Sequence, residues 1–324
     1  MKKRIAVLTS GGDAPGMNAG IRAVVRTALA NDLEIFGCRN GFKGLVEDDL
    51  FELDQTSVAN HIQRGGTILK TDRYPEFTQA LVRQRAIKNL EQRGIEALIV
   101  LGGNGSFCGA KILGDESGIK TIGIPCTIDN DIIGTDYTVG FDTACNSALR
   151  AIDNIRDTAF SHSNNFLVEV MGRSSGFLAM HVGLAGGAEV ILVPEIEFSV
   201  DDLINRIRDR HRLKLGSIII VAEADEPGRS FKIADEINSQ LDIIYRVCVL
   251  GHTQRGGIPT LRDREIASLM GYHAIKALLD GHDQVMVAYQ QEQCAIIDFH
   301  DPCMGARKLT DTTLFDINNI LCDL

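Results

Sequence analysis

The stretch Thr127-Ile128-Asp129-Asn130-Asp131 places a hydroxyl and two carboxylates at alternate positions. In extended backbone, alternate side chains point the same way, so we expect Thr127, Asp129 and Asp131 to face one cavity. Two carboxylates this close ionise together only when a cation or a reacting hydroxyl lies between them. One carboxylate acting as a base and one beside a metal would suit phosphoryl transfer. The competing interpretation is a simple turn, because Asp and Asn favour turns.

Composition limits the function classes that this chain can belong to. The chain has 324 residues, with 33 Lys and Arg against 43 Asp and Glu, for a net charge of −10. This length predicts about two domains, and the acidic balance argues against a nucleic-acid partner or an anionic membrane. The cysteines form no CxxC pair and have no matching His spacing, which disfavours a zinc site and suits a reducing compartment. We find no apolar run typical of a signal sequence or membrane span, so we expect a cytoplasmic protein.

Glycine-rich or acidic loops follow three of the predicted strands. Residues 5–8 form an apolar run before the glycine-rich turn 9–18, and a helix with one buried face follows the turn. A strand, a glycine turn and a helix in this order offer backbone N–H groups to phosphate. The turn matches neither GxxxxGK[ST] nor GxGxxG. The strand at residues 97–101 leads to Gly102-Gly103-Asn104-Gly105-Ser106, and the strand at 121–124 leads to the carboxylate loop.

The remaining pattern alternates strands with helices. Helices are expected at about 78–93 and 146–159, and further strands at 34–37, 166–170, 190–193, 217–222, 247–250 and 285–289. This alternation predicts an α/β doubly wound architecture with parallel sheets. The carboxyl ends of parallel strands share one edge, where ligands bind, so the loops should converge into a kinase-like cleft.

Four motifs together resemble the bacterial ATP-dependent 6-phosphofructokinase family. They are Gly-Gly-Asp-Ala-Pro-Gly-Met-Asn at 11–18, Thr-Ile-Asp-Asn-Asp at 127–131, Met-Gly-Arg at 171–173 and Gly-His-Thr-Gln-Arg-Gly-Gly at 251–257. The resemblance implies two Rossmann-like three-layer α/β/α domains that face a cleft. It assigns residues 1–140 with 254–304 to an ATP-binding domain, and 141–253 with 305–324 to a sugar-phosphate-binding domain. It also implies a homotetramer with sugar sites shared between subunits.

The resemblance further implies direct transfer of the ATP γ-phosphoryl group to the 1-hydroxyl of fructose 6-phosphate, with Mg²⁺ as cofactor. Asp129 would be the general base and Thr127 would orient the hydroxyl. Arg173 and Arg73 would neutralise charge on the transferring group.

The family's other sites carry over residue by residue. The ATP positions are Gly11, Arg73, Gly102, Gly103, Asn104, Gly105 and Ser106. The metal positions are Asn104 and Asp131. The sugar-phosphate positions are Thr127, Asp129, Asn164, Met171, Gly172, Arg173, Glu223, Arg246, His252 and Arg255, with Arg246 reaching in from a partner subunit. The effector-site positions are Arg22, Arg26, Arg156, Glu189 and Lys214. Outside the family context, Arg173 and Arg255 would be interpreted as loop-stapling arginines and His252 as a buried neutral histidine.

Three substitutions depart from the family pattern in the active-site motifs. Asn104 replaces an Asp that helps to hold Mg²⁺, so one charge is lost and we expect weaker Mg²⁺ or ATP engagement. Cys126 replaces a Gly; it is either a reactive thiol or a tolerated small residue. Asn164 replaces an Arg that binds the sugar 6-phosphate across the subunit interface, and an amide cannot fully replace that bond.

Two further comparisons bear on regulation and on the phosphoryl donor. Gln55 and Leu215 stand where the family's effector site has basic residues, so we expect weaker effector binding. Pyrophosphate-using relatives carry Asp at the position of Gly105 and Lys at the position of Cys126. Neither is present here, which favours ATP as the donor.

Two alternatives to a fructose 6-phosphate kinase stay open. One is a paralogue that phosphorylates a different sugar or sugar phosphate. The other is a catalytically weak subunit that binds nucleotide or sugar phosphate and regulates a partner enzyme. Retention of Thr127, Asp129, Asp131 and Arg173 favours an enzyme, because a binding subunit needs no base, whereas Asn104 and Asn164 favour the alternatives.

Overall fold

The chain folds into two compact units, each built from several segments. The computed structural model describes residues 2–210, 216–224, 226–303 and 305–322. The first unit comprises Met1–Ile128, Ile132–Thr143 and Arg255–Ala306, and the second comprises Asp129–Asp131, Ala144–Gln254 and Arg307–Leu324. The three residues Asp129–Asp131 therefore pack with the second unit, although the chain on either side of them belongs to the first.

The first unit is built on a seven-stranded sheet in the order β11-β10-β5-β4-β1-β2-β3. The central strands β10, β5, β4, β1 and β2 run parallel, while β3 and β11 pair antiparallel at the two edges. Their bounds are β1 Arg4–Thr9, β2 Glu34–Cys38, β3 Leu50–Glu52, β4 Ile95–Gly102, β5 Lys120–Pro125, β10 Val285–Gln290 and β11 Gln293–Asp298.

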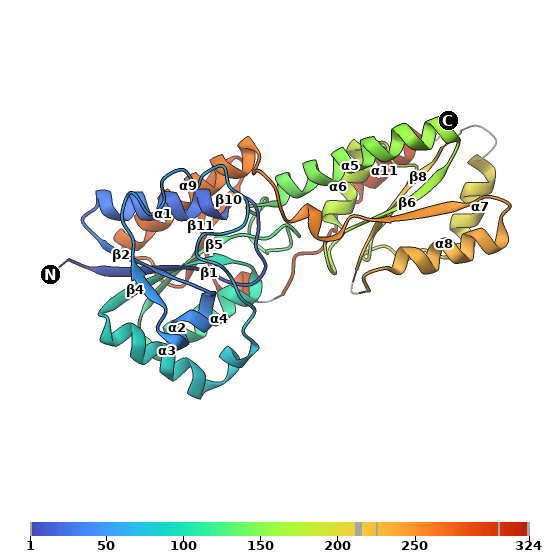
Figure 1. The fold of residues 1–324 in the computed structure, drawn as a ribbon. Helices are drawn as coiled ribbons and strands as arrows, with labels where there is room; N and C mark the ends of the chain where they lie inside the picture. Colours follow the sequence, from blue (N-terminus) through green and yellow to red (C-terminus); the bar gives the residue numbers. More distant parts are fainter. Residues whose placement is uncertain (1, 211–215, 225, 304, 323–324) are drawn as a thin grey trace. The chain divides into compact units, whose positions relative to one another are not determined.

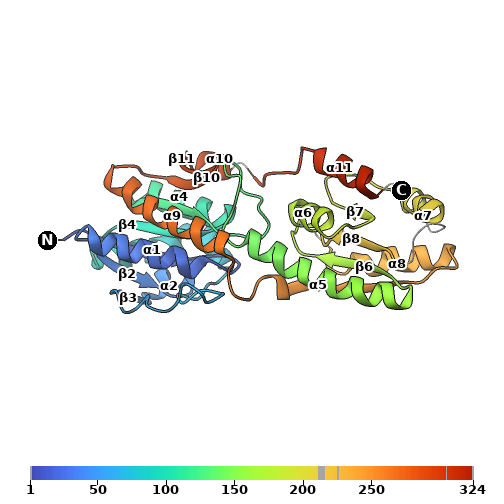
Figure 2. The same cartoon turned by 90° about the horizontal axis from the view of Figure 1, so that it is seen from above.

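Helices cover both faces of this sheet, as Figures 1 and 2 show. On one face lie α1 (Met17–Ala30) and α9 (Leu261–Leu279), and on the other α2 (Gly41–Glu47), α3 (Ala80–Gln92) and α4 (Asn104–Ser117). The short helices η1 (Pro75–Thr78) and α10 (His300–Cys303) complete the unit. Strands β1, β4 and β5 are almost fully buried because helices cover both sides, which explains their continuous apolar sequence.

The second unit has a parallel four-stranded sheet in the order β7-β8-β6-β9. Its strands are β6 Asn165–Val170, β7 Val190–Leu192, β8 Ile218–Ala222 and β9 Tyr245–Val249. Apolar side chains of α7 (Val200–Arg210) and α8 (Arg229–Gln240) pack on one face. The helices α5 (Phe141–His162), α6 (Phe177–Ala185) and α11 (Thr313–Cys322) lie on the other, and η2 (Gly251–Gln254) follows β9 (Figure 1).

The predicted α/β class and parallel strands are confirmed, and each strand expected from the sequence is present within two residues of its predicted bounds. The sequence analysis missed the edge strands β3 and β11. Their residues are partly exposed, so they lack the continuous apolar run that marks a strand buried on both faces. In the part of the chain that the structure describes, the helices are either too short or too polar to cross a bilayer.

Candidate active site

Three loops meet at the carboxyl edge of the first unit's sheet. The Gly11 N–H donates to the Asp72 carbonyl at 3.2 Å, and the Thr71 hydroxyl donates to the Gly11 carbonyl at 2.9 Å. The Ser106 hydroxyl donates to the Ser10 carbonyl at 3.1 Å. The structure thus brings the predicted ATP positions at 11, 102–106 and the segment that bears Arg73 into contact, because β1 and β4 are neighbours that end at the same edge.

The start of α4 leaves open space where a ligand could approach its backbone. A Cβ added to Gly103 or Gly105 would meet no atom within 4 Å. At Gly102, by contrast, an added Cβ would lie 2.7 Å from the Ser10 carbonyl oxygen, so only glycine fits there. Since α4 begins at Asn104, its first N–H groups and the positive end of its dipole face this space. This geometry can hold a phosphate chain.

Arg255 lies against the glycine loop of the first unit. A Cβ on Gly12 would lie 2.1 Å from its Nη1, and Nη1 is 3.9 Å from the Asp13 carboxylate. The family resemblance predicts a sugar-phosphate role for Arg255, and in this structure its side chain contacts the loop that carries Gly11. The guanidinium thus lies close against the backbone at Gly12.

Thr127 and Cys126 are held at the end of β5 by residues further along the chain. The Thr127 N–H donates to the Val139 carbonyl at 3.1 Å, and the Thr138 hydroxyl donates to the Thr127 carbonyl at 2.7 Å. Cys126 is buried. Burial, with a smaller contribution from the charge of Asp263, raises the pKa of its thiol well above the ordinary value. The interpretation of Cys126 as a reactive thiol is therefore wrong, because reactivity needs an accessible thiolate.

Asp129 and Arg173 come together in the second unit. The Arg173 Nε lies 3.8 Å from the Asp129 carboxylate, whose side chain is 6% exposed, whereas the arginine side chain is 51% exposed. The buried carboxylate is thus paired with a cation that is open to solvent on its other side. A base next to an accessible guanidinium is a suitable arrangement for proton abstraction beside a group that carries negative charge.

The expectation of extended backbone from Thr127 to Asp131 is wrong. Asn130 has φ 51°, in the left-handed region, so the alternation of side chains breaks between the two aspartates. Burial, followed by the charge of Asp129, raises the pKa of Asp131 to about 6. The two carboxylates therefore do interact electrostatically, as their spacing suggested, but through a turn at a residue type that tolerates this conformation.

The Met-Gly-Arg loop is shaped by two residues with positive φ. Gly172 has φ 137° and Arg173 φ 50°, and a Cβ on Gly172 would lie 2.6 Å from the Ser175 carbonyl oxygen. The Arg173 N–H donates to the Glu223 carboxylate at 3.3 Å. The predicted positions Met171, Gly172, Arg173 and Glu223 are thus brought together at the carboxyl ends of β6 and β8.

Asn164 and Arg246 lie at the opposite edge of the same sheet. Asn164 immediately precedes β6, whereas Met171 follows it, and Arg246 pairs in register with Phe166 near the beginning of β6. A six-residue strand spans about 20 Å. Within one chain these two residues therefore cannot join Arg173. His252 lies on η2 after β9 and is exposed, so the interpretation of a buried neutral histidine is wrong.

Two of the predicted effector-site residues contact each other within the second unit. Arg156 lies 3.8 Å from Glu189 and donates to the Gly186 and Gly187 carbonyls at 2.6 and 2.8 Å. Arg22 and Arg26 are on α1 of the first unit. Lys214 and Leu215 lie outside the described residues. The structure thus pairs Arg156 with Glu189 in the second unit, whereas Arg22 and Arg26 belong to the first unit.

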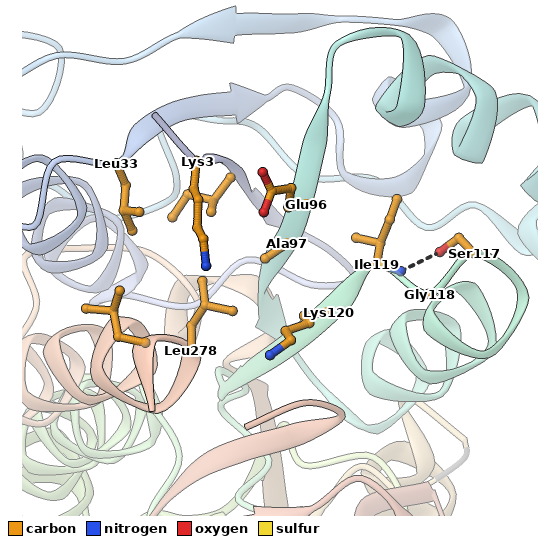
Figure 3. A pocket seen from close by; sticks show the side chains of 11 residues that line it. Lys3, Leu33, Glu96, Ala97, Ser117, Gly118, Ile119, Lys120 and Leu278 are labelled. Carbon is orange, nitrogen blue, oxygen red and sulfur yellow. Dashed lines mark hydrogen bonds between the residues drawn. The ribbon is translucent and has the colours of Figure 1, made fainter. Parts of the chain in front are cut away.

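The first unit has a cavity of about 350 Å³ that is lined by other residues (Figure 3). Its walls include Lys3 before β1, Glu96 and Lys120 at the amino ends of β4 and β5, and Ser117 at the end of α4. It is therefore at the sheet edge opposite the glycine loops and includes none of the predicted site residues.

The predicted Mg²⁺ positions offer hard oxygen donors, an Asn104 amide and an Asp131 carboxylate, which suit this ion. The raised pKa of Asp131 beside Asp129 marks a place where a cation would relieve repulsion between carboxylates. Across the described residues, no group of three or more His, Cys, Asp or Glu side chains is arranged to hold a metal ion. This combination fits an ion held by one or two protein oxygens together with substrate phosphates.

Sequence reasoning missed two residues that hold the site in place. The Ser175 hydroxyl donates to the Asp129 carbonyl at 3.1 Å and is buried. Asp263 accepts hydrogen bonds from the turn that contacts Thr127. Asp263 follows Thr260 in a T-x-x-D pattern, which predicts a helix cap, and that cap is present. No sequence signal predicts its contacts with residues 140 and 143, more than 100 positions away.

Comparison with known proteins identifies the family. The profile described as Phosphofructokinase matches residues 4–278. The chain belongs to the phosphofructokinase family. A Coxiella burnetii protein named ATP-dependent 6-phosphofructokinase is 58% identical over 320 residues, covering 99% of this chain and 98% of that protein. A Staphylococcus carnosus protein of the same name is 52% identical, covering 92% of this chain and 93% of that protein.

Solved phosphofructokinase structures share the fold. The Pichia pastoris phosphofructokinase superposes with a TM-score of 0.88 at 34% identity, covering 94% of this chain and 36% of that one. A pyrophosphate-dependent phosphofructokinase from Marinobacter aquaeolei gives a TM-score of 0.84 at 25% identity, covering 95% of this chain and 85% of that one. The chain thus spans about a third of the yeast protein. These matches confirm the predicted phosphofructokinase fold.

Proposed function

We propose that this protein is an ATP-dependent 6-phosphofructokinase that transfers the γ-phosphoryl group of ATP to the 1-hydroxyl of fructose 6-phosphate, a reaction of glycolysis. The observation that carries the proposal is the 58% identity, over nearly the full length of both chains, to a relative named for this activity. The buried Asp129 beside Arg173 supports the same conclusion, because this geometry supplies a base and a cation for phosphoryl transfer.

In the proposed mechanism, Asp129 accepts the proton of the 1-hydroxyl while that oxygen attacks the γ-phosphorus and ADP departs. Thr127 orients the hydroxyl. Arg173, whose guanidinium is half exposed beside the carboxylate, neutralises negative charge on the transferring group. Ser175 fixes the backbone of Asp129 by donating to its carbonyl, which keeps the base in one place relative to the Met171–Arg173 loop.

The phosphates of ATP are assigned to the glycine loops of the first unit. Gly11, Gly102, Gly103, Gly105 and Ser106 lie around the start of α4, where backbone N–H groups face open space. Arg73 follows the segment that hydrogen-bonds Gly11 and would add a guanidinium. Domain roles follow from this assignment: the first unit binds nucleotide and the second binds sugar phosphate.

Asn104 and Asp131 would hold Mg²⁺ by their oxygen atoms, with Asp131 as the charged donor. When bound, the ion supplies charge neutralisation at the terminal phosphates. The contribution of the chain itself is the Asp131 carboxylate, a charged oxygen ligand for a cation. Because position 104 carries an amide rather than a carboxylate, we expect a higher Mg²⁺ requirement than in relatives with Asp.

The sugar 6-phosphate site is proposed to be shared between subunits of a homotetramer. Glu223, Met171, Gly172 and Arg173 form one cluster, while Arg246 and Asn164 lie about 20 Å away along β6. Arg246 is exposed on the edge strand β9, which also exposes Val249. A cation on an exposed sheet edge is available to a neighbouring subunit. His252 and Arg255 are assigned to the sugar phosphate on family grounds.

An effector site and a cytoplasmic location belong to the same proposal. Arg156 and Glu189, which already pair, would form its centre, with Arg22, Arg26 and Lys214 as further charged groups. An exposed Gln55 in place of a basic residue reduces the positive charge available to an anionic effector.

A coupled assay of the purified protein tests the proposal. The acceptors are fructose 6-phosphate, other ketose phosphates and unphosphorylated fructose, each with ATP or pyrophosphate as the donor. We expect the highest kcat/KM for ATP with fructose 6-phosphate. A higher kcat/KM for another acceptor would reject the assigned substrate, and turnover with pyrophosphate but not ATP would reject the assigned donor.

Asn164 is the observation that favours a different acceptor, so a second variant addresses it. Asn164→Arg should lower the KM for fructose 6-phosphate if the acceptor carries a 6-phosphate, because it restores a charge-assisted bond. Binding of ATP without turnover of any acceptor would instead identify a regulatory subunit.

A further inference from the structure

A buried carboxylate outside the proposed catalytic residues holds the turn before α5. Asp263, on the first turn of α9, is 0% exposed. One of its oxygens accepts from the Gly140 N–H at 2.7 Å, and the other accepts from the Thr143 N–H at 2.8 Å and from the Thr143 hydroxyl. A carboxylate with three donors and no exposure is fixed in one orientation, and it fixes the donors in turn.

The turn held by Asp263 is the partner of the loop that bears Thr127. The Val139 N–H donates to the Pro125 carbonyl at 2.9 Å, and the Thr127 N–H donates to the Val139 carbonyl at 3.1 Å. The Thr138 hydroxyl completes the pairing at the Thr127 carbonyl. The backbone of Thr127 thus has two hydrogen bonds to residues 138–139, and Pro125 has a third. Residues 138–139 directly precede the Asp263 contact at residue 140.

The same turn packs tightly against the glycine loop. A Cβ on Gly140 would lie 2.6 Å from the Ala14 Cβ. A Cβ on Gly16 would lie 2.7 Å from Val139 and 3.4 Å from the Asp263 Cβ. Because there is no spare room at either glycine, a shift of residues 139–140 must displace either residues 14–16 or Thr127.

We infer that Asp263 is a positioning residue for the phosphoryl transfer: through residues 138–143 it fixes Thr127 and the glycine loop relative to each other. The inference rests on the proposed function, since Thr127 is the residue that orients the acceptor hydroxyl. Asp263 itself does not act on substrate. Burial raises its pKa to about 6, so at neutral pH it is ionised and all of its oxygens are acceptors.

Asp263→Asn tests the inference, because an amide nitrogen cannot accept and leaves at least one of the donors without a partner. We expect kcat to fall about 10- to 100-fold, since a displacement of Thr127 on the order of 1 Å has effects of this size. The KM for ATP should stay within about twofold of wild type. Hydrogen exchange should accelerate at the amides of residues 127 and 139–143 and stay unchanged in the second unit.

Glu169→Gln is the matched control. Glu169 is a buried carboxylate of the second unit that also accepts three hydrogen bonds, from the Gly228 N–H, the Ser230 N–H and the Ser230 hydroxyl at 2.6, 3.0 and 2.6 Å. It caps α8 rather than a loop of the proposed site. The control should lose similar stability while kcat stays within about threefold of wild type. Equal losses of kcat in the two variants would overturn the positioning role.

Milder variants cover the case in which Asp263→Asn does not fold. Thr143→Val removes one donor to Asp263, and Thr138→Val removes the bond to the Thr127 carbonyl. Each should lower kcat about 3- to 10-fold, and the double variant should lose less than the product of the single losses, because both act on one turn. Independent, multiplicative losses, or unchanged kcat in both, would reject the inference. A wild-type protein without phosphofructokinase turnover would instead reject the proposed function itself, whatever the exchange data show.

Discussion

At the scale of single residues, the proposed chemistry depends on one buried carboxylate with one exposed cation. Asp129 is the buried member and Arg173 the exposed one. The asymmetry matters because the base must stay in position while the cation must reach a substrate oxygen. The Ser175 hydroxyl, which donates to the Asp129 carbonyl, and the Glu223 carboxylate, which accepts from the Arg173 N–H, hold the two backbones in place.

Asp129→Asn should lower kcat about 10²- to 10⁴-fold, because the amide cannot accept the hydroxyl proton. ATP affinity and melting temperature should change little, since the substitution is close to isosteric. The measurement is steady-state kinetics together with equilibrium binding of a non-hydrolysable ATP analogue. A variant that keeps a tenth or more of wild-type kcat would reject the assignment of the base.

The raised pKa of Asp131 predicts how the stability of the protein depends on pH. Its pKa is raised from the ordinary 3.8 to about 6, first by burial and then by Asp129. The native state therefore binds this proton more tightly than the unfolded state, and stability falls as pH rises through that window. Asp131→Asn should remove this loss and raise the free energy of unfolding at pH 8 by about 1–3 kcal/mol, with little change at pH 4.

Urea unfolding at several pH values measures this effect. Asp263 also has a raised pKa of about 6. The free energy of unfolding of Asp131→Asn should therefore still fall with pH in the same range, but less steeply than that of the wild type. Identical pH profiles for wild type and Asp131→Asn would show that burial of Asp131 does not destabilise its charge. The variant should also require more Mg²⁺ for half-maximal rate, because a charged oxygen ligand is lost.

At the scale of elements, a substitution at the start of α4 should affect nucleotide binding and stability in opposite ways. Gly105 lies in the first turn of α4 and has open space where a side chain would be. An Asp in the first turn of a helix interacts favourably with the dipole, so Gly105→Asp should keep or raise the melting temperature. The added charge should nevertheless repel the phosphates of ATP.

We therefore expect Gly105→Asp to raise the KM for ATP by about tenfold or more, as expected for a like charge placed in an anion site. Gly105→Ala is the control: it fills little space, adds no charge and should keep the KM within about threefold. The comparison requires kinetics of both variants and a thermal melt. If the Asp variant bound ATP as well as the Ala variant did, the phosphates would have to lie elsewhere.

At the scale of the whole molecule, the distribution of charged residues over the second unit argues for a shared site. Arg246 lies near the amino end of β6, and Arg173 follows its carboxyl end. If Arg246 serves a neighbouring subunit, a subunit without Arg246 can be complemented by one without Asp129. Random pairing of the two kinds of subunit leaves about a quarter of the sites with neither lesion.

Co-expression of Arg246→Ala and Asp129→Asn chains should therefore recover up to about one quarter of wild-type activity, although each variant alone is strongly impaired. Light scattering should give a mass near four times the 35.3 kDa chain mass. Mixed assemblies no more active than the better parent would show that Arg246 acts within its own chain. A monomeric mass would reject the shared site altogether.

The sequence by itself determined the α/β class, the parallel strands and the glycine loops at their carboxyl ends. These features are local: a continuous apolar run marks a strand buried on both faces, and glycine marks backbone that no other residue fits, as at Gly102. The motifs at 11–18, 127–131, 171–173 and 251–257 were sufficient to identify the family.

Only the tertiary structure decided the features that depend on distant neighbours. It placed Asn130 in the left-handed region, buried Cys126, and grouped Asp129–Asp131 with the second unit. It also joined Asp263 to the turn at residues 140–143. The burial and the pKa of a side chain depend on atoms from distant parts of the chain that pack around it, so no pattern of neighbouring residues in the sequence predicts them. For this reason Asp129 could be proposed as the base from its motif, whereas the residues that hold its surroundings in place could not be predicted.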